Sequence, residues 1–184
     1  MNFLGFVAGR SDSRSLLQRY RQRLYRLAYA WTRDVATAED LVQEALAKAW
    51  HKRAQLRNPN AGEAWLFSIL ARCHQDYLRR AHATDDIDEL TLTSSSDPES
   101  ENEQHTIVGR VRAAIASLPA GQRQAVTLVD LEGFSYAEVA DILAVPVGTV
   151  MSRLCRARAT LKRRLLDVSE GRTEAVHTGI RRIK

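Results

Sequence analysis

Cysteine is scarce in this sequence, and long apolar runs are missing. The two cysteines among 184 residues, Cys73 and Cys155, lie far apart and form no CxxC pair, so we expect reduced thiols in a cytoplasmic protein. No stretch approaches the roughly 18 consecutive apolar residues that a membrane-spanning helix needs. The apolar segment 1–9 precedes a group of arginines instead of following a basic stretch, which is unlike a signal peptide. These absences argue against a secreted or membrane-embedded protein.

The sequence also lacks the motifs that mark common enzyme active sites. It contains no nucleophile elbow, no HExxH zinc motif and no phosphate-binding P-loop. Cys73 and His74 are adjacent, but neighbours on a helix point about 100° apart, which suits neither a catalytic dyad nor a zinc site. We therefore expect a protein that acts by binding, with no enzymatic activity, metal or cofactor.

The charge balance favours a polyanionic partner. The chain has 27 Lys and Arg against 22 Asp and Glu, a net charge of +5 and a sequence pI of about 9.6. Such a balance fits nucleic acid or an anionic membrane surface, although charge alone does not choose between them.

Apolar residues recur at three- and four-residue steps over most of the chain, which predicts an all-α fold. In the N-terminal part we expect one helix from about Ser15, a second with Thr37 as its N-cap, and a third over about Glu63–Arg80. The Asn58-Pro59-Asn60 sequence predicts a loop between the last two helices.

The composition changes abruptly between Thr84 and Gln104. This segment holds eight acidic residues and no Lys or Arg, together with a run of three serines. It cannot bury enough apolar surface to offset the entropy cost of ordering it. We therefore predict two small helical domains, 15–81 and 106–166, joined by a flexible acidic linker over 82–105, with an N-terminal extension (1–14) and a basic tail (167–184).

The C-terminal part has the pattern of a helix-turn-helix. Ser135 and Glu138 form a capping box that opens a short helix, and a turn over 144–148 leads into a long helix over about 149–166. Six basic residues and no acidic one lie between Ser152 and Leu166. Guanidinium groups suit phosphate oxygens and the acceptor edge of guanine, so the pattern predicts DNA binding. A solvated basic face on a structural helix is the alternative.

An ordered run of motifs covers the same part of the chain: Leu118-Pro119, Gln122-Arg123, the segment Leu131–Ala140, Val147–Val150, Ser152-Arg153 and Arg156-Ala157-Arg158. This run resembles region 4 of the extracytoplasmic-function (ECF) sigma factors. The resemblance implies that the helix 149–162 reads the upstream (−35) promoter element and that the protein contacts the flap region of RNA polymerase. The implied DNA contacts are Thr149, Ser152, Arg153, Arg156, Arg158 and Lys162.

The N-terminal part carries a second set: Asp40–Glu44, Ala47–Trp50, Ala64-Trp65-Leu66 and Asp76–Arg80. This set resembles region 2 of the same family. The resemblance implies that Asp40, Gln43 and Glu44 contact the clamp helices of the largest subunit of core RNA polymerase. Their i, i+3 and i+4 spacing puts them on one polar helix face, although an ordinary solvated face would show the same spacing.

The loop after the second helix matches the part of region 2 that captures the downstream (−10) element as single-stranded DNA. Many relatives carry Asn at the position of Arg72, so the family's promoter preferences do not transfer directly to this site. We expect Trp50 and Trp65 to be core residues and not base-stacking platforms. The implied −10 contacts are Arg53, Arg57, Asn58, Asn60, Arg72, Arg79 and Arg80.

The resemblance implies promoter DNA and core polymerase as partners, and control by an anti-sigma factor that in this family is often membrane-bound. A helix-turn-helix regulator that binds duplex DNA without replacing the sigma subunit is the alternative. The sequence has no phosphoacceptor βα pattern of a response regulator, and its N-terminal half is helical.

Overall fold

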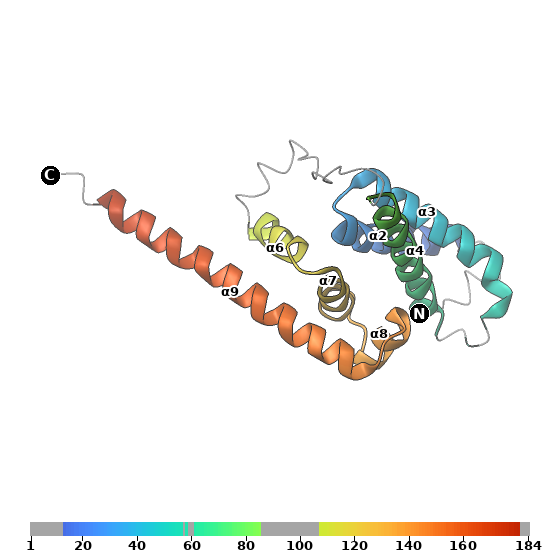
Figure 1. Ribbon diagram of the computed structural model, residues 1–184. Helices are drawn as coiled ribbons and strands as arrows, with labels where there is room; N and C mark the ends of the chain where they lie inside the picture. The colour runs from blue at the N-terminus through green and yellow to red at the C-terminus, as the bar shows by residue number, and fades with distance from the viewer. Residues whose placement is uncertain (1–12, 57, 59–60, 86–106, 181–184) are drawn as a thin grey trace.

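The computed structural model describes residues 13–56, 58, 61–85 and 107–180 (Figure 1). Within these ranges every regular element is a helix and no strand occurs, as the sequence predicts. The elements form two helical units that are separate in sequence, one before residue 86 and one after residue 106.

The N-terminal unit contains α2 (Ser13–Thr32), α3 (Val35–Lys52), the short 3₁₀ helix η1 (Arg53–Gln55) and α4 (Gly62–Asp85). Helix α3 packs against both α2 and α4. Each helix turns its apolar stripe inward, and the fully buried side chains of the unit include Leu24, Leu66, Phe67 and Leu70.

Helix α3 begins earlier than the sequence predicts. Its N-cap is Asp34, whose carboxylate accepts a hydrogen bond of 2.6 Å from the backbone N–H of Thr37, so Thr37 is not the cap. Hydrogen bonds from the Thr37 hydroxyl and from its backbone N–H lower the pKa of Asp34. The preceding Arg33 has a φ of 61°, which ends α2 and lets α3 start within two residues. Aspartate is as good an N-cap as threonine, and the left-handed conformation of Arg33 put Asp34 at the N-cap position.

The C-terminal unit contains α6 (Ile107–Ala116), α7 (Ala120–Val126), a π-helical segment η3 (Thr127–Leu131), α8 (Tyr136–Leu143) and α9 (Val147–Ile180). The predicted capping box is confirmed. The Ser135 hydroxyl accepts from the backbone N–H of Glu138, and the Glu138 carboxylate accepts from the backbone N–H of Ser135. Hydrogen bonds from the Ser135 hydroxyl and then from its backbone N–H lower the pKa of Glu138. Ala144, with a φ of 53°, ends α8.

Helix α9 is longer than predicted at both ends. It starts at Val147, before the expected Thr149, and runs past Leu166 to Ile180 as the long arm in Figure 1. Val150, Leu154 and Ala157 are buried against the unit. The inward stripe of the predicted recognition helix is therefore confirmed over its first three turns.

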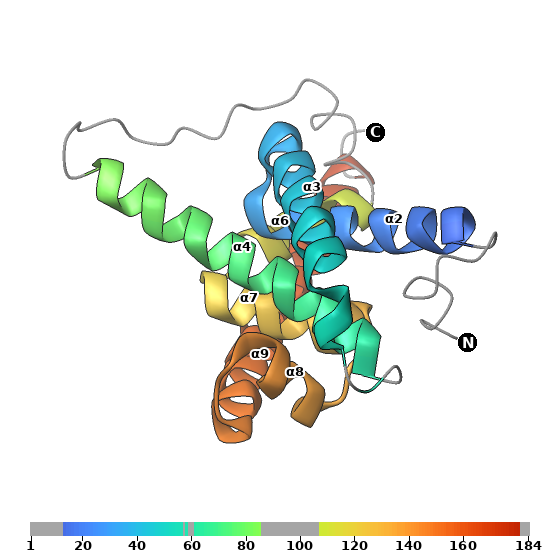
Figure 2. The same cartoon turned by 90° about the vertical axis from the view of Figure 1, so that its right-hand side faces the viewer.

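The two units pack against each other. Helix α2 contacts α6, α7 and η3, and α4 contacts α8; Figure 2 shows α7 and α8 lying alongside α4. One continuous cluster of buried residues runs through both units. Helix α4 also continues through residues 82–85, which were expected to belong to the linker; the rest of the predicted linker lies outside the described residues.

Candidate functional site

The predicted polymerase-binding residues lie on the outer face of α3. Asp40 and Gln43 are exposed, and Glu44 is half-buried beside Lys48, whose ammonium lies 2.7 Å from the carboxylate. The opposite face of α3 is buried at Ala38, Leu41, Val42, Ala45 and Ala49. The three polar residues therefore share one accessible surface, as their spacing predicts, and their role stays a prediction.

Trp50 lies on that same surface, and the expectation that it is a core residue is wrong. Its side chain is 51% exposed at the C-terminal end of α3. The Arg53 guanidinium lies 4.3 Å from the centre of the indole ring and donates a 2.7 Å hydrogen bond to the Trp50 carbonyl. Trp50 follows Gln43 by seven residues, or two helical turns, and this spacing in the sequence indicates that both side chains lie on the same exposed face of α3. Trp65, by contrast, packs against the core with partial exposure.

The predicted downstream DNA contacts lie around the end of α3 and along α4. Arg72, Arg79 and Arg80 are exposed, and their spacing of seven and eight residues puts them on one side of α4. Asp76 lies beside this row. Its carboxylate is 3.6 Å from Arg79, and its carbonyl accepts from Arg80 at 3.3 Å. Asn58 is exposed in the loop.

Two predicted residues of this loop, Arg57 and Asn60, lie outside the described residues. The structure thus brings Arg53, Asn58 and the α4 row to the accessible surface of the N-terminal unit. It does not test which of them touches DNA.

The exposed side of α9 begins with three linked residues. Ser152 donates a 3.0 Å hydrogen bond to the Thr149 carbonyl, and Arg156 donates to the carbonyl and hydroxyl of Ser152 at 3.2 and 3.3 Å. Ser152 and Arg156 are both exposed. These bonds fold the Arg156 side chain back toward the start of α9, where a recognition helix contacts base edges.

The other predicted contacts of α9 have different surroundings. Arg153 is half-buried, and its guanidinium packs over Gly121 of α7. The fit is close, because a Cβ atom added to Gly121 would lie only 3.0 Å from the guanidinium carbon. Arg158 donates two hydrogen bonds to the Asp130 carboxylate, and these bonds raise its pKa. Lys162 is exposed one turn further on. Arg158 thus already has a partner inside the unit, and Arg153 packs against α7.

Comparison with known proteins identifies the family. A family model described as Sigma-70 region 2 matches residues 16–84, and one described as Sigma-70, region 4 matches residues 109–161. An ECF RNA polymerase sigma factor of Mycobacterium tuberculosis, SigM, is 36% identical over 158 residues, which cover 85% of this chain and 78% of SigM. The chain belongs to the ECF RNA polymerase sigma factors. The sigma-E factor of Escherichia coli, also of the ECF type, is 34% identical and covers 79% of this chain, with 82% of its own length matched.

Solved structures agree with this assignment. The sigma factor RpoE of Bartonella quintana, crystallised with the anti-sigma factor NepR, is 32% identical with a TM-score of 0.72, covering 86% of this chain and 99% of its own. CnrH, solved in complex with the cytosolic domain of CnrY, is 24% identical with a TM-score of 0.64 and covers 90% of this chain and 95% of its own; it supports the fold alone. Helices α2 to α4 are therefore region 2 of this ECF sigma factor, and α6 to α9 include region 4.

The described residues contain no group of three or more His, Cys, Asp or Glu side chains arranged to hold a metal ion. Among the described helices, none has the length and apolar character that crossing a membrane requires.

Proposed function

We propose that this ECF sigma factor binds core RNA polymerase through the outer face of α3 and directs it to promoters with −10 and −35 elements. The observation that carries the proposal is the separation of two accessible faces. The acidic face of α3 carries Asp40 and Gln43, and the basic face of α9 carries Ser152 and Arg156. One protein can therefore hold polymerase and DNA at the same time.

Transcription with purified components tests this proposal. Core polymerase plus the full chain should produce a run-off transcript from a promoter taken from the native genome, and core polymerase alone should not. A regulator that leaves the sigma subunit in place would bind the promoter without core polymerase and would produce no transcript in this assay. That outcome would contradict the proposal.

Within region 4, we assign base reading to Ser152 and Arg156 and phosphate contact to Thr149 and Lys162. The Arg158 side chain pairs with Asp130, so we assign it to positioning α9, and Arg153, which packs over Gly121, stays a proposed contact of the −35 element. Within region 2, the −10 strand would follow the loop and the basic row of α4. The residues proposed there are Arg53, Arg57, Asn58, Asn60, Arg72, Arg79 and Arg80.

We further propose that the protein works in the cytoplasm, where polymerase acts, through binding alone and without a catalytic step. RpoE of Bartonella quintana was crystallised with an anti-sigma factor, so we propose an anti-sigma partner here as well. Affinity purification from the native host before induction should recover such a partner. Recovery of polymerase subunits alone would contradict this part of the proposal.

Trp50→Ala is expected to weaken binding to core polymerase about tenfold or more. An exposed aromatic side chain beside a charged recognition stripe is the kind of residue that anchors protein interfaces. Titration of labelled protein with core polymerase measures the change. Val35→Ala is the matched control, because Val35 is also exposed (46%) but lies at the opposite end of α3. Equal affinities for the two variants would remove Trp50 from the interface.

A further inference from the structure

The exposed side of α9 carries apolar residues that the polar contacts described so far do not use. Met151 is 53% exposed, and Cys155, one turn later, is exposed as well. Each follows a buried residue of the inward stripe, Val150 or Leu154, and so lies outside the core. A Cβ atom built on Gly148, three residues before Met151, would meet no atom of the described residues within 4 Å. Because residues four apart are neighbours on a helix, Met151 and Cys155 form one accessible apolar strip.

The apolar strip lies beside the polar pair Ser152 and Arg156. Ser152 precedes Cys155 by three residues, and this spacing also makes neighbours on a helix. The hydrogen bonds from Arg156 to the Ser152 carbonyl and hydroxyl hold the guanidinium over Ser152. The four side chains therefore form one surface, with hydrogen-bonding groups along one line and apolar groups along the other.

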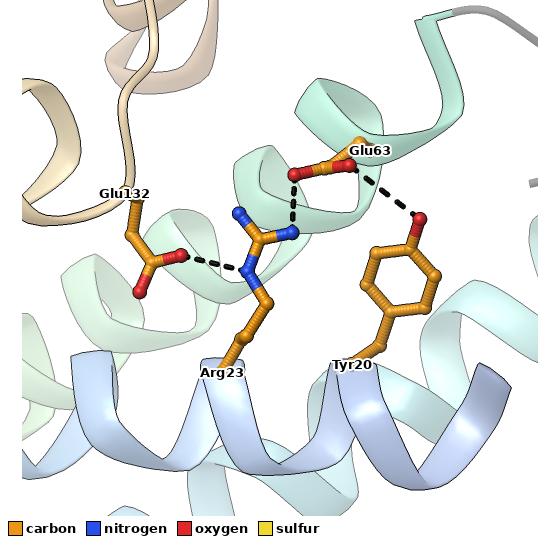
Figure 3. Close-up of polar contacts among 4 residues, drawn as sticks. All are labelled: Tyr20, Arg23, Glu63 and Glu132. Carbon is orange, nitrogen blue, oxygen red and sulfur yellow. Dashed lines mark hydrogen bonds and ion pairs between the residues drawn. The ribbon is translucent and has the colours of Figure 1, made fainter. Parts of the chain in front are cut away.

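The charge that α9 presents beside this strip is positive. Between positions 147 and 166 the helix has six basic residues and no acidic one. Two carboxylates that precede the helix-turn-helix already have partners. Asp130 accepts two hydrogen bonds from Arg158. Glu132 is directed at Arg23 of α2, whose Nε lies 2.8 Å from the carboxylate (Figure 3). An occupant of the strip is therefore expected to be a polyanion with apolar groups on its surface, and DNA has this character.

Thymine offers the apolar group that the strip can contact. In the major groove thymine is distinguished by its C5 methyl group, which is read by apolar contact and not by a hydrogen bond. The thioether of methionine is flexible and polarisable, and a free cysteine behaves as a small apolar side chain. Met151 and Cys155 are about 6 Å apart along α9, at 1.5 Å per residue, which is less than two steps of 3.4 Å between base pairs. The strip can therefore span two neighbouring base pairs.

Lys162 is placed consistently with this orientation of α9. It follows Cys155 by seven residues, so it lies on the same line of the helix, and it is exposed. Along the axis it is about 10 Å beyond Cys155. The major groove is about 12 Å wide, so a helix that holds Cys155 at the base edges brings Lys162 to the flanking phosphates.

We propose that Met151 and Cys155 read thymine methyl groups of the −35 element, within about two base pairs of the guanine contacted by Arg156. This inference rests on the proposed function, because it requires α9 to lie in the major groove. Contact with the strip removes a methyl group from water, which stabilises the complex in proportion to the apolar area buried. The methyl contacts thus add selection at positions that Ser152 and Arg156 do not read.

Uracil in place of thymine tests the proposal, because it lacks the methyl group and keeps every hydrogen-bonding group. Holoenzyme assembled from core polymerase and the full chain is first used to select promoters from a library of −35 sequences. Each thymine of the selected element is then replaced in turn. We expect an affinity loss of about fourfold at one or two thymines. Met151→Ala should abolish the loss at one of them, and Cys155→Ser at the other.

Two control variants separate the strip from general effects on α9. Leu166→Ala is the matched control, because Leu166 is 50% exposed on the same helix but lies about 22 Å beyond Met151 along the axis. It should keep the full uracil effect. Met151→Leu retains an apolar side chain of similar size and should keep most of it.

Several outcomes would overturn the proposal. The unmodified holoenzyme could bind thymine and uracil promoters equally, or select a −35 element without thymine near the guanine. A uracil effect that persists in both Met151→Ala and Cys155→Ser would come from DNA shape. Loss of affinity for core polymerase in Met151→Ala, measured without DNA, would show that the strip binds protein. A holoenzyme that binds no promoter would contradict the proposed function, and the inference with it.

The thiol of Cys155 provides a second test. A promoter with its −35 element should protect Cys155 from N-ethylmaleimide about tenfold more than a promoter whose −35 element is scrambled, as followed by peptide mass spectrometry. Cys73 does not compete for the reagent, because it is buried and burial raises the pKa of its thiol. Equal alkylation of Cys155 on the two promoters would refute its place in the groove.

Discussion

Replacing both Asp40 and Glu44 with arginine is expected to weaken binding to core RNA polymerase by a factor on the order of 100 or more, since like charges would then face each other across the interface. The structure supports a clean test, because Asp40 is exposed and Glu44 is half-buried on the outer face of α3, away from the apolar side of the helix. Titration of labelled protein with core polymerase measures the loss.

The main side effect of this double replacement can be removed. Glu44 pairs with Lys48 one turn away, so an arginine at position 44 would repel Lys48 and cost a few tenths of a kcal/mol of helix stability. Adding Lys48→Glu restores the ion pair with its polarity reversed and should return the thermal unfolding midpoint without returning polymerase affinity. Asp141→Arg, an exposed charge reversal on α8, should bind normally. Normal affinity of the original double variant would show that this face of α3 does not contact polymerase.

Arg156→Ala is expected to relax promoter specificity at one or two base pairs of the −35 element. The Arg156 side chain is exposed and held toward the start of α9 by its hydrogen bonds to Ser152. From there a guanidinium can bond both O6 and N7 of a guanine, which is worth about 1–3 kcal/mol of discrimination between bases. Transcription or binding measured over a library of −35 sequences reports the change.

Two further variants separate base reading from phosphate contact. Arg156→Lys retains the charge but not the planar pair of donors, so it should lose discrimination nearly as much as the alanine variant. Lys162→Ala should weaken binding evenly over all sequences. It should also reduce the slope of log affinity against log salt concentration by roughly one unit, the loss of one phosphate contact. A uniform loss of affinity in Arg156→Ala, with base preferences unchanged, would mean that Arg156 contacts phosphate.

The elements predicted correctly are those set by neighbours in sequence. The capping box needs only a serine and a glutamate three residues apart, and both of its hydrogen bonds are present. The polar face of α3 and the inward stripe of α9 follow from the 3.6-residue period, since a helix that buries Leu41 and Ala45 must expose Asp40 and Gln43.

Trp50 was predicted wrongly because its residue type was given more weight than its position. Large aromatic side chains are usually buried, but Trp50 lies outside the run of inward positions that ends at Ala49. The start of α3 was misplaced for a related reason. Both Asp34 and Thr37 can cap a helix, and the choice depended on the positive φ of Arg33.

The sequence by itself determined the helices, the two regions and the family, because amphipathic period, capping and motif order are all local properties of the chain. Only the tertiary structure decided how the regions meet. Trp31 and Thr127 are 96 positions apart in the sequence, and His74 and Gln124 are 50 positions apart. No periodicity of the sequence links residues so far apart. Burial of a polar group is favourable only when a partner arrives with it, and that partner comes from the other region once both have folded.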